Sequence, residues 1–320
     1  MDILGGIGDI RSKTIRTTRS PGEVFSEDGL RLMRLARFAA LLGFIPTEEV
    51  ISAAKLYSPL INDISVERIR DELDKILVCD TFYGVKDAHV TGLNILLETD
   101  VLPKILPELT LGIGMPQRQD YHAYDVFTHI LMTVRAADPS VRLAALFHDV
   151  AKPILKIQTG RYHGHDVVGG KMTREILFKY RYPTAVIEET ARLVENHMFN
   201  LDNNVKDSTL RRFLLKNADI IDKLILLKIA DMIGSGRDKT LDYSSVDRIK
   251  NTFLQMKSEN VPFSVSELLV DGNDLKQIPE LPENKRGEAL NALLQERVLA
   301  DSPLTTKEKQ LQFIVNYARR

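Results

Sequence analysis

Cysteine is nearly absent from this 320-residue sequence, which has a single one at Cys79. A lone thiol excludes an intramolecular disulfide framework and any zinc site built from several cysteines, and it fits a reducing compartment. The sequence also lacks any apolar run as long as a membrane span, and no apolar stretch of signal-peptide length stands near Asp2. We therefore expect a cytoplasmic protein that has no membrane partner.

Charge of one sign is not in excess either, because 43 Lys and Arg residues and 44 Asp and Glu residues give a net charge of -1. This balance argues against a uniformly basic coat for nucleic acid, so contacts with RNA or phosphate must come from local clusters. One such cluster is expected at residues 152–181, where seven basic residues face two acidic ones. The hydrophobic content of 44% is ordinary for a globular chain of two or three domains.

The clearest chemistry in the sequence is the adjacent pair His148 and Asp149. The pair follows the segment 141–147, which is apolar on nearly every side and predicts a buried helix. A buried imidazole and a buried carboxylate both need partners. Either neighbouring side chains satisfy them by hydrogen bonding, or a divalent cation neutralises the carboxylate and binds the imidazole.

Two histidines before this pair and one after it stand close enough in the sequence to join it. His122 and His129 are seven residues apart, which would place them nearly on one face of an expected helix, and either could reach an interior site. His165 lies in a segment that we expect to be an irregular loop, ahead of a break at Gly169 and Gly170. A polar loop explains His165 equally well.

Two further polar residues interrupt apolar helical patterns. His197 lies in the apolar stripe of a helix expected from Thr184, where a histidine is more often a satisfied core residue than a metal ligand. Asp231 lies in the segment 225–233, a helix that is apolar almost all round. An unpaired carboxylate buried there would be costly, so Asp231 needs a partner.

Near the N-terminus, Arg31, Arg34 and Arg37 repeat every third residue on a helix that we expect to begin with Ser26 as its N-cap. Such a row by itself is typical of a solvated helix face. A second amphipathic helix is expected over residues 66–77.

Two motifs in this region, together with Asp2 and Gly5-Gly6, resemble the bacterial CCA-adding tRNA nucleotidyltransferase and poly(A) polymerase family. They are Glu27-Asp28-Gly-Leu-Arg31-Leu-Met-Arg34-Leu-Ala-Arg37 and Glu67-Arg68-Ile-Arg-Asp-Glu72-Leu73. The resemblance implies that Asp28 and Arg31 read the base edge of an incoming nucleotide, since a carboxylate accepts from an exocyclic amine and a guanidinium donates to ring acceptors. Arg34 and Arg37 are then expected to bind tRNA or other RNA.

The sequence departs from this family at its start. The family's catalytic head, with a glycine-rich phosphate loop and paired magnesium-binding carboxylates, precedes these motifs, and only its final turn is expected here, at residues 2–18. We therefore do not expect nucleotidyl transfer by this chain alone. The alternative function is a tRNA- and nucleotide-binding subunit, or fragment, of a split enzyme that works with a separately encoded head.

The order of the polar residues in the middle of the chain resembles the HD phosphohydrolase superfamily. The resemblance implies that His129, His148, Asp149 and Asp231 bind one metal ion and that His165 and His197 help bind a second. His148, Asp149 and the trailing Lys152 would be catalytic. Ligands without thiolate suit Mn, Ni, Co, Fe, Zn or Mg. The alternative is a degenerate domain whose polar cluster is only hydrogen-bonded.

These observations predict an all-α fold: a head remnant at 1–25, an RNA-binding neck and body at 26–115, an HD domain at 116–242 and a helical tail at 243–320. In the tail, residues 271–274 are expected to form a turn, and Thr305 with Glu308 a capping box. The expected function is that of a metal-dependent HD-domain phosphohydrolase or phosphodiesterase in tRNA or RNA 3'-end processing.

Overall fold

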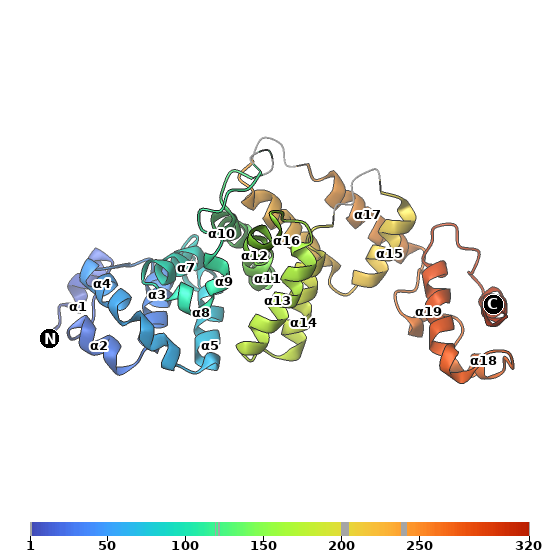
Figure 1. The fold of residues 1–320 in the computed structure, drawn as a ribbon, viewed down its shortest axis with the longest axis horizontal. Helices are drawn as coiled ribbons and strands as arrows, with labels where there is room; N and C mark the ends of the chain where they lie inside the picture. The colour runs from blue at the N-terminus through green and yellow to red at the C-terminus, as the bar shows by residue number, and fades with distance from the viewer. Residues whose placement is uncertain (1, 119, 121, 200–204, 238–241, 320) are drawn as a thin grey trace. The chain divides into compact units, whose positions relative to one another are not determined.

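The computed structural model describes residues 2–118, 120, 122–199, 205–237 and 242–319 (Figure 1). Over these residues the chain is helical apart from β1 (Thr14–Ile15) and β2 (Ile45–Pro46), which pair in parallel. The prediction of an all-α fold is therefore confirmed. None of the described helices is both long enough and apolar enough to cross a membrane.

The helices follow one another with short connections. Up to residue 115 they are α1 (Gly6–Ser12), α2 (Pro21–Glu27), α3 (Leu30–Leu42), α4 (Glu48–Tyr57), η1 (Ser58–Asp63), α5 (Val66–Leu77), α6 (Asp80–Tyr83), α7 (Ala88–Glu98), α8 (Leu102–Ile105) and α9 (Pro107–Thr110). Next come α10 (Val126–Ala136), η2 (Pro139–Val141), α11 (Arg142–Phe147), α12 (Lys152–Thr159), α13 (His165–Lys179), α14 (Thr184–Asn196), α15 (Asp207–Asn217) and α16 (Ile221–Gly234). The last are α17 (Ser244–Ser258), η3 (Val265–Glu267), α18 (Gly272–Lys276), η4 (Glu283–Lys285), α19 (Arg286–Arg297) and α20 (Lys307–Ala318).

The chain folds into two compact units. The first consists of residues 1–198 and 223–241, and the second of residues 199–222 and 242–320. All of the candidate site residues named from the sequence belong to the first unit. The four sequence-based domain boundaries remain predictions, because this division by compactness does not follow them.

The expected helix at Val66–Leu77 is confirmed, whereas the expected start at Ser26 is wrong. Ser26 lies inside α2, which begins with Pro21 and is capped by Ser20, whose side chain accepts from the Glu23 backbone. Proline fits the first helical position because its missing N–H has no partner there in any helix. The chain then breaks at Asp28, whose Oδ1 accepts from the Leu30 backbone N–H at 3.0 Å as α3 begins.

The expected break at Gly169 and Gly170 is also wrong, since α13 runs through both residues and lies beside α14 (Figure 1). A Cβ atom at Gly170 would lie 2.1 Å from Cγ of Glu195 in α14. The glycines therefore serve close helix packing rather than a turn. This approach brings the start of α13, which carries His165, toward the end of α14, where His197 lies.

A buried arginine ties the helix before the His-Asp pair to the preceding helices. Arg142, the first residue of α11, is 5% exposed. Its guanidinium forms a bidentate ion pair with Asp80 at 2.5 and 2.7 Å and donates to the carbonyls of Leu77 and Ala137 at 2.7 and 3.1 Å. Because these bonds satisfy the planar donor fork, the charge is tolerated in the interior, and α11 is held in one orientation.

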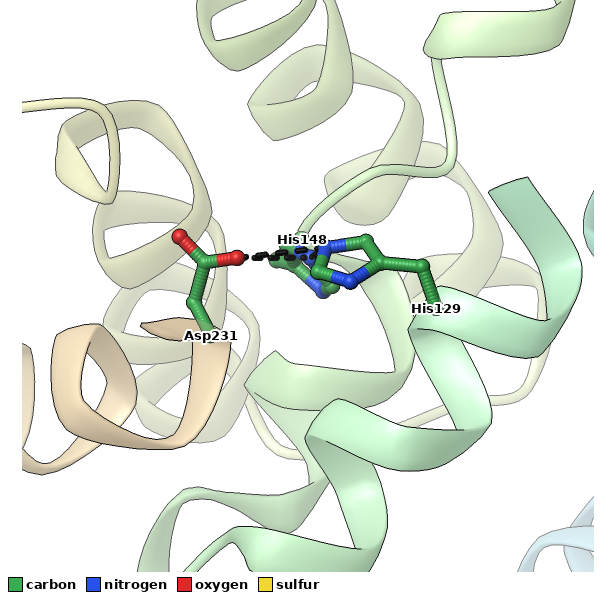
Figure 2. A group of neighbouring side chains, drawn as sticks. All are labelled: His129, His148 and Asp231. Carbon is green, nitrogen blue, oxygen red and sulfur yellow. Dashed lines mark hydrogen bonds and ion pairs between the residues drawn. The ribbon is translucent and has the colours of Figure 1, made fainter. Parts of the chain in front are cut away.

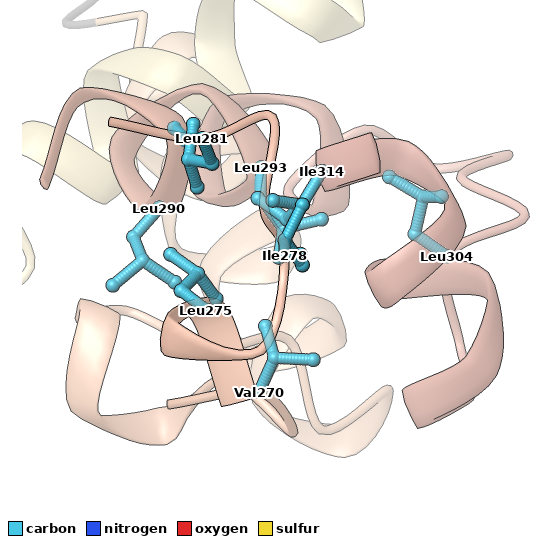
Figure 3. Packing of buried hydrophobic residues seen from close by; sticks show 9 residues of the cluster. Val270, Leu275, Ile278, Leu281, Leu290, Leu293, Leu304 and Ile314 are labelled. Atoms are coloured by element: carbon cyan, nitrogen blue, oxygen red, sulfur yellow. The ribbon is translucent and has the colours of Figure 1, made fainter. Parts of the chain in front are cut away.

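The second unit has its own core around α18, α19 and α20 (Figure 3). The buried residues of this cluster are Val270, Leu275, Ile278, Leu281, Ala289, Leu290, Leu293, Leu304 and Ile314. Two local predictions here are wrong. The segment 271–274 starts α18 instead of a turn, because Asp271 and Asp274 form a capping box, and the cap of α20 is Thr306 instead of Thr305.

Truncation of Leu293 tests this core. Leu293 is 0% exposed, so Leu293→Ala should lower the free energy of unfolding by about 2–5 kcal/mol through lost burial and the cavity left behind. The measurement is urea unfolding followed by circular dichroism. The matched control is Leu254→Ala, whose side chain is 63% exposed and should change stability by less than about 0.5 kcal/mol. Equal effects of the two substitutions would contradict the assigned core.

Candidate metal centre

His129 enters the site from α10. Asp125 caps this helix and accepts from the Thr128 backbone N–H at 2.7 Å. The His129 side chain is fully buried, and its Nδ1 lies 3.2 Å from the carbonyl oxygen of Gly234 at the end of α16. This contact requires close helices, because a Cβ atom at Gly234 would lie 2.4 Å from Oγ1 of Thr133 in α10.

The other three histidines have the same arrangement but find their partners locally. Each follows or begins a helix and places Nδ1 against the carbonyl oxygen three residues earlier. The pairs are His148 with Ala145 at 2.7 Å, His165 with Tyr162 at 2.8 Å and His197 with Val194 at 2.7 Å. A carbonyl oxygen can only accept, so Nδ1 carries the proton in all four rings. Each neutral ring therefore presents Nε2 as a lone pair, the form in which histidine binds metals.

The first group of potential ligands is His129, His148 and Asp231, shown in Figure 2. Oδ1 of Asp231 lies 3.1 Å from Nε2 of His129 and 3.8 Å from Nε2 of His148. The two Nε2 atoms are 3.1 Å apart. Two neutral imidazoles that both direct lone pairs at this distance cannot hydrogen-bond to each other, whereas a shared cation would satisfy both.

The second group is Asp149, His165 and His197. Oδ1 of Asp149 lies 3.2 Å from Nε2 of His165 and 3.8 Å from Nε2 of His197. Asp149 Oδ1 and His165 Nε2 are buried and have no hydrogen-bond partner among the described residues. Burying two facing acceptors without a donor is unfavourable, and a cation between them removes the penalty.

Asp149 also joins the two groups. Its Oδ2 lies 3.3 Å from Nε2 of both His129 and His148, while its Oδ1 faces the second group. The side chain is 1% exposed. Although burial raises its pKa, Lys152 and His148 hold the pKa of Asp149 well below its usual range, so the carboxylate is ionised. The donor set of imidazole nitrogens and carboxylate oxygens thus fits one or two divalent cations.

The electrostatics of His129 and His197 are opposite. Burial lowers the pKa of His129, but hydrogen bonds to Asp149 and Asp231 outweigh it and raise this pKa to about 9. Burial and the neighbouring charge of His148 lower the pKa of His197 to about 3. Without a cation, a proton on His129 would thus compensate the carboxylates, and a metal ion would have to displace it.

Lys152, the lysine that trails the pair, lies at the edge of this centre. Its Nζ is 2.7 Å from Oδ2 of Asp149 and 2.8 Å from Oε1 of Gln117. The residue is 6% exposed, so its charge is held in place by these two partners. The structure therefore brings together all six predicted metal ligands and the predicted catalytic lysine, and their roles remain predictions.

The nucleotide- and RNA-binding candidates lie elsewhere in the first unit. Asp28 receives a hydrogen bond from Arg68 at 3.2 Å, and Arg31 donates to Glu27 and to the Val24 carbonyl, both at 2.7 Å. Among the described contacts, none leads from these residues to the histidines. Their assignment to nucleotide binding remains a prediction.

Of the two predicted RNA-binding arginines, only Arg34 presents much of its side chain to solvent. The Arg34 side chain is 46% exposed and lies 3.8 Å from Glu72. Arg37 is 16% exposed, donates to Glu72 at 2.6 Å and lies over the Phe38 ring at 4.1 Å. Arg37 is therefore largely committed to packing within the chain.

Sequence reasoning missed Gln117 as a partner of the centre and misplaced His122. The interpretation that His122 shares a helix face with His129 is wrong, because α10 begins only at Val126, after its cap Asp125. Even so, the His122 ring lies 4.5 Å from that of His129. The N-cap preference of Asp125 at the start of an apolar pattern is the signal that could have placed His122 before the helix.

Metal binding should release protons. Because the pKa of His129 is about 9 when only the carboxylates face it, binding of Mn²⁺ near neutral pH should release about one proton, and the apparent affinity should rise as the pH approaches 9. Asp149 and His197 should release none, since both are already in their ligand forms. Titration calorimetry in buffers of different ionisation enthalpy measures the protons. Binding without proton release at neutral pH would contradict this assignment.

The chain was then compared with known proteins. The profile of the HD domain family matches residues 120–233, and the profile described as "Probable RNA and SrmB-binding site of polymerase A" matches residues 43–111. A solved structure, the Bacillus stearothermophilus CCA-adding enzyme in complex with CTP, superposes with a TM-score of 0.64. Its sequence identity is 20%, and the alignment covers 100% of this chain and 69% of that one, so this likeness concerns the fold.

Two relatives are similar over nearly the whole sequence. The A-adding tRNA nucleotidyltransferase of Deinococcus radiodurans is 31% identical over 343 aligned residues, which cover 99% of this chain and 74% of the relative. The CC-adding tRNA nucleotidyltransferase of Thermus thermophilus is 30% identical over 323 residues, covering 96% and 70%. The chain thus belongs to the tRNA nucleotidyltransferase family of CCA-adding enzymes and carries an HD domain within it.

Proposed function

We propose that the HD domain of this chain is a metal-dependent phosphohydrolase or phosphodiesterase that acts in the processing of tRNA or RNA 3' ends. The observation that carries the proposal is the pair of ligand groups that share Asp149, with every histidine Nδ1 already donated to a carbonyl. This arrangement is costly as a purely hydrogen-bonded cluster, because several buried acceptors face one another. It is favourable as a ligand set.

The residues present define what the site can do. When bound, a divalent cation supplies Lewis acidity for a phosphoryl oxygen and lowers the pKa of an attacking water. Asp149, ionised and shared by the two groups, would hold two cations close together. Lys152 holds one oxygen of Asp149 and places a positive charge beside the centre, where it would offset the charge of a phosphate.

The basic segment 152–181 contributes less than its composition suggests. Arg174 forms ion pairs with Glu188 at 3.0 Å and Glu195 at 2.5 Å, and Arg181 pairs with Glu67. These two arginines therefore brace helices and domains within the first unit. Of the basic residues in the segment, Lys152 is the one for which the structure gives a contact to the proposed centre.

The proposal is tested by Asp149→Ala. Removal of the shared carboxylate should abolish bound metal and reduce hydrolysis of bis-p-nitrophenyl phosphate or a 2',3'-cyclic nucleotide at least about 100-fold, while tRNA binding persists. Elemental analysis and turnover assays with Mn²⁺, Ni²⁺, Co²⁺ and Mg²⁺ provide the measurements. Asp63→Ala, the same change at an exposed position, should alter neither. A wild type that binds no metal and is inert with all four ions would refute the hydrolase.

A second function, tRNA and nucleotide binding, is supported by the RNA-binding family profile at residues 43–111 and by the relatives, which are named tRNA nucleotidyltransferases. In this proposal Asp28 and Arg31 exchange their present partners, Arg68 and Glu27, for the edge of a base. A separately encoded nucleotidyltransferase head is the proposed protein partner. This function and the hydrolase use different residues, so one chain can have both.

Arg34→Ala tests the RNA contact. Loss of one phosphate contact should weaken tRNA binding several-fold at low salt and reduce the salt dependence by about one counterion. Fluorescence anisotropy at several salt concentrations measures both quantities. The matched control is Arg135→Ala, because that side chain is 47% exposed compared with 46% for Arg34. If both variants bind tRNA like the wild type, Arg34 does not contact RNA.

A further inference from the structure

A fifth histidine, His122, faces the proposed metal centre without belonging to either ligand group. Its ring packs edge-on against His129, with the centroids 4.5 Å apart and the planes at 70°. Its backbone N–H donates to the Arg118 carbonyl at 3.0 Å, and the next residue, Ala123, donates to the Ser235 carbonyl at 2.9 Å. The second bond anchors the segment before α10 to the end of α16, which carries Asp231.

The bonding of His122 differs from that of the other four histidines of the site. In those four rings a backbone carbonyl accepts from Nδ1, whereas Nδ1 of His122 is buried and has no hydrogen-bond partner among the described residues. Leaving such a nitrogen unsatisfied is unfavourable unless a ligand supplies the partner. His122 is thus built to meet something that arrives at the centre.

The surroundings of His122 define the chemistry of that ligand. Burial, Lys152 and His129 lower the pKa of His122 to about 4, so the ring is neutral and can donate one N–H. Charges on Asp149 and Asp231 also act on it, and a bound cation would neutralise both. Gln117, from the same connecting segment, holds Lys152 at 2.8 Å. A neutral N–H donor beside a fixed ammonium suits an anionic oxygen.

We propose that His122 and Lys152 form a subsite that binds a phosphoryl oxygen of the substrate beside the metal centre. The subsite rests on the proposed hydrolase, because the phosphate it binds is the one that would be hydrolysed. His122 contacts the substrate in this assignment, and Gln117 is a positioning residue that acts through Lys152. The segment between the two domains thereby becomes part of the site.

The test uses inorganic phosphate as the probe and the full chain loaded with Mn²⁺. His122→Phe keeps the ring but removes both nitrogens, so it should retain metal and weaken phosphate binding about tenfold, the effect of one lost hydrogen bond to a charged group. His122→Asn places an amide near the former Nδ1 and should restore most of the affinity. His163→Phe, at an exposed position of the neighbouring loop, should leave phosphate binding unchanged.

The outcomes separate the subsite from the hydrolase. If His122→Phe keeps its metal and binds phosphate like the wild type, the subsite is wrong and the hydrolase stands. If His122→Phe loses its metal, His122 is a metal ligand and the subsite is again wrong. If the wild type binds Mn²⁺ but neither binds phosphate nor hydrolyses a diester, both proposals are overturned. Rescue by His122→Asn but not by His122→Leu would support the subsite.

Discussion

The structure around the candidate site depends on one constraint: several hydrogen-bond acceptors converge in the interior without enough donors. Each neutral histidine has committed its single N–H to a backbone carbonyl, and the carboxylates of Asp149 and Asp231 bring only further acceptors. Lys152 supplies one positive charge, which is not enough for both carboxylates. A cation, or a proton in its place, is therefore part of the stability of this domain as well as of its chemistry.

The helices are packed to satisfy this constraint. Gly234 lets α16 approach α10 closely enough for its carbonyl to reach His129, and Gly170 lets α13 and α14 bring His165 and His197 together. Arg142 fixes the orientation of α11 from the opposite side by its bonds to Asp80 and two carbonyls. Substitutions at these positions would change the site without touching it.

The neck is organised around a different buried charge. Glu72, whose side chain is 5% exposed, receives Arg37 at 2.6 Å and lies within 4 Å of Arg34 and Lys75. A carboxylate shared by three cations leaves a net positive surface on this side of α3 and α5, which suits phosphate. The arginine row that looked like an ordinary solvated face is thus partly an internal network, with Arg34 as its outward member.

The sequence alone determined the helical class, the helix at Val66–Leu77, the identity of the six candidate ligands and the family motifs, because these depend on local periodicity and residue type. Only the tertiary structure decided which histidine nitrogen faces the centre, because that depends on where a carbonyl such as that of Gly234 lies, 105 residues from His129. It likewise decided that Asp149 joins two groups and that His122 reaches the site from outside α10. Such contacts join residues far apart in the chain, and no local pattern in the sequence records them.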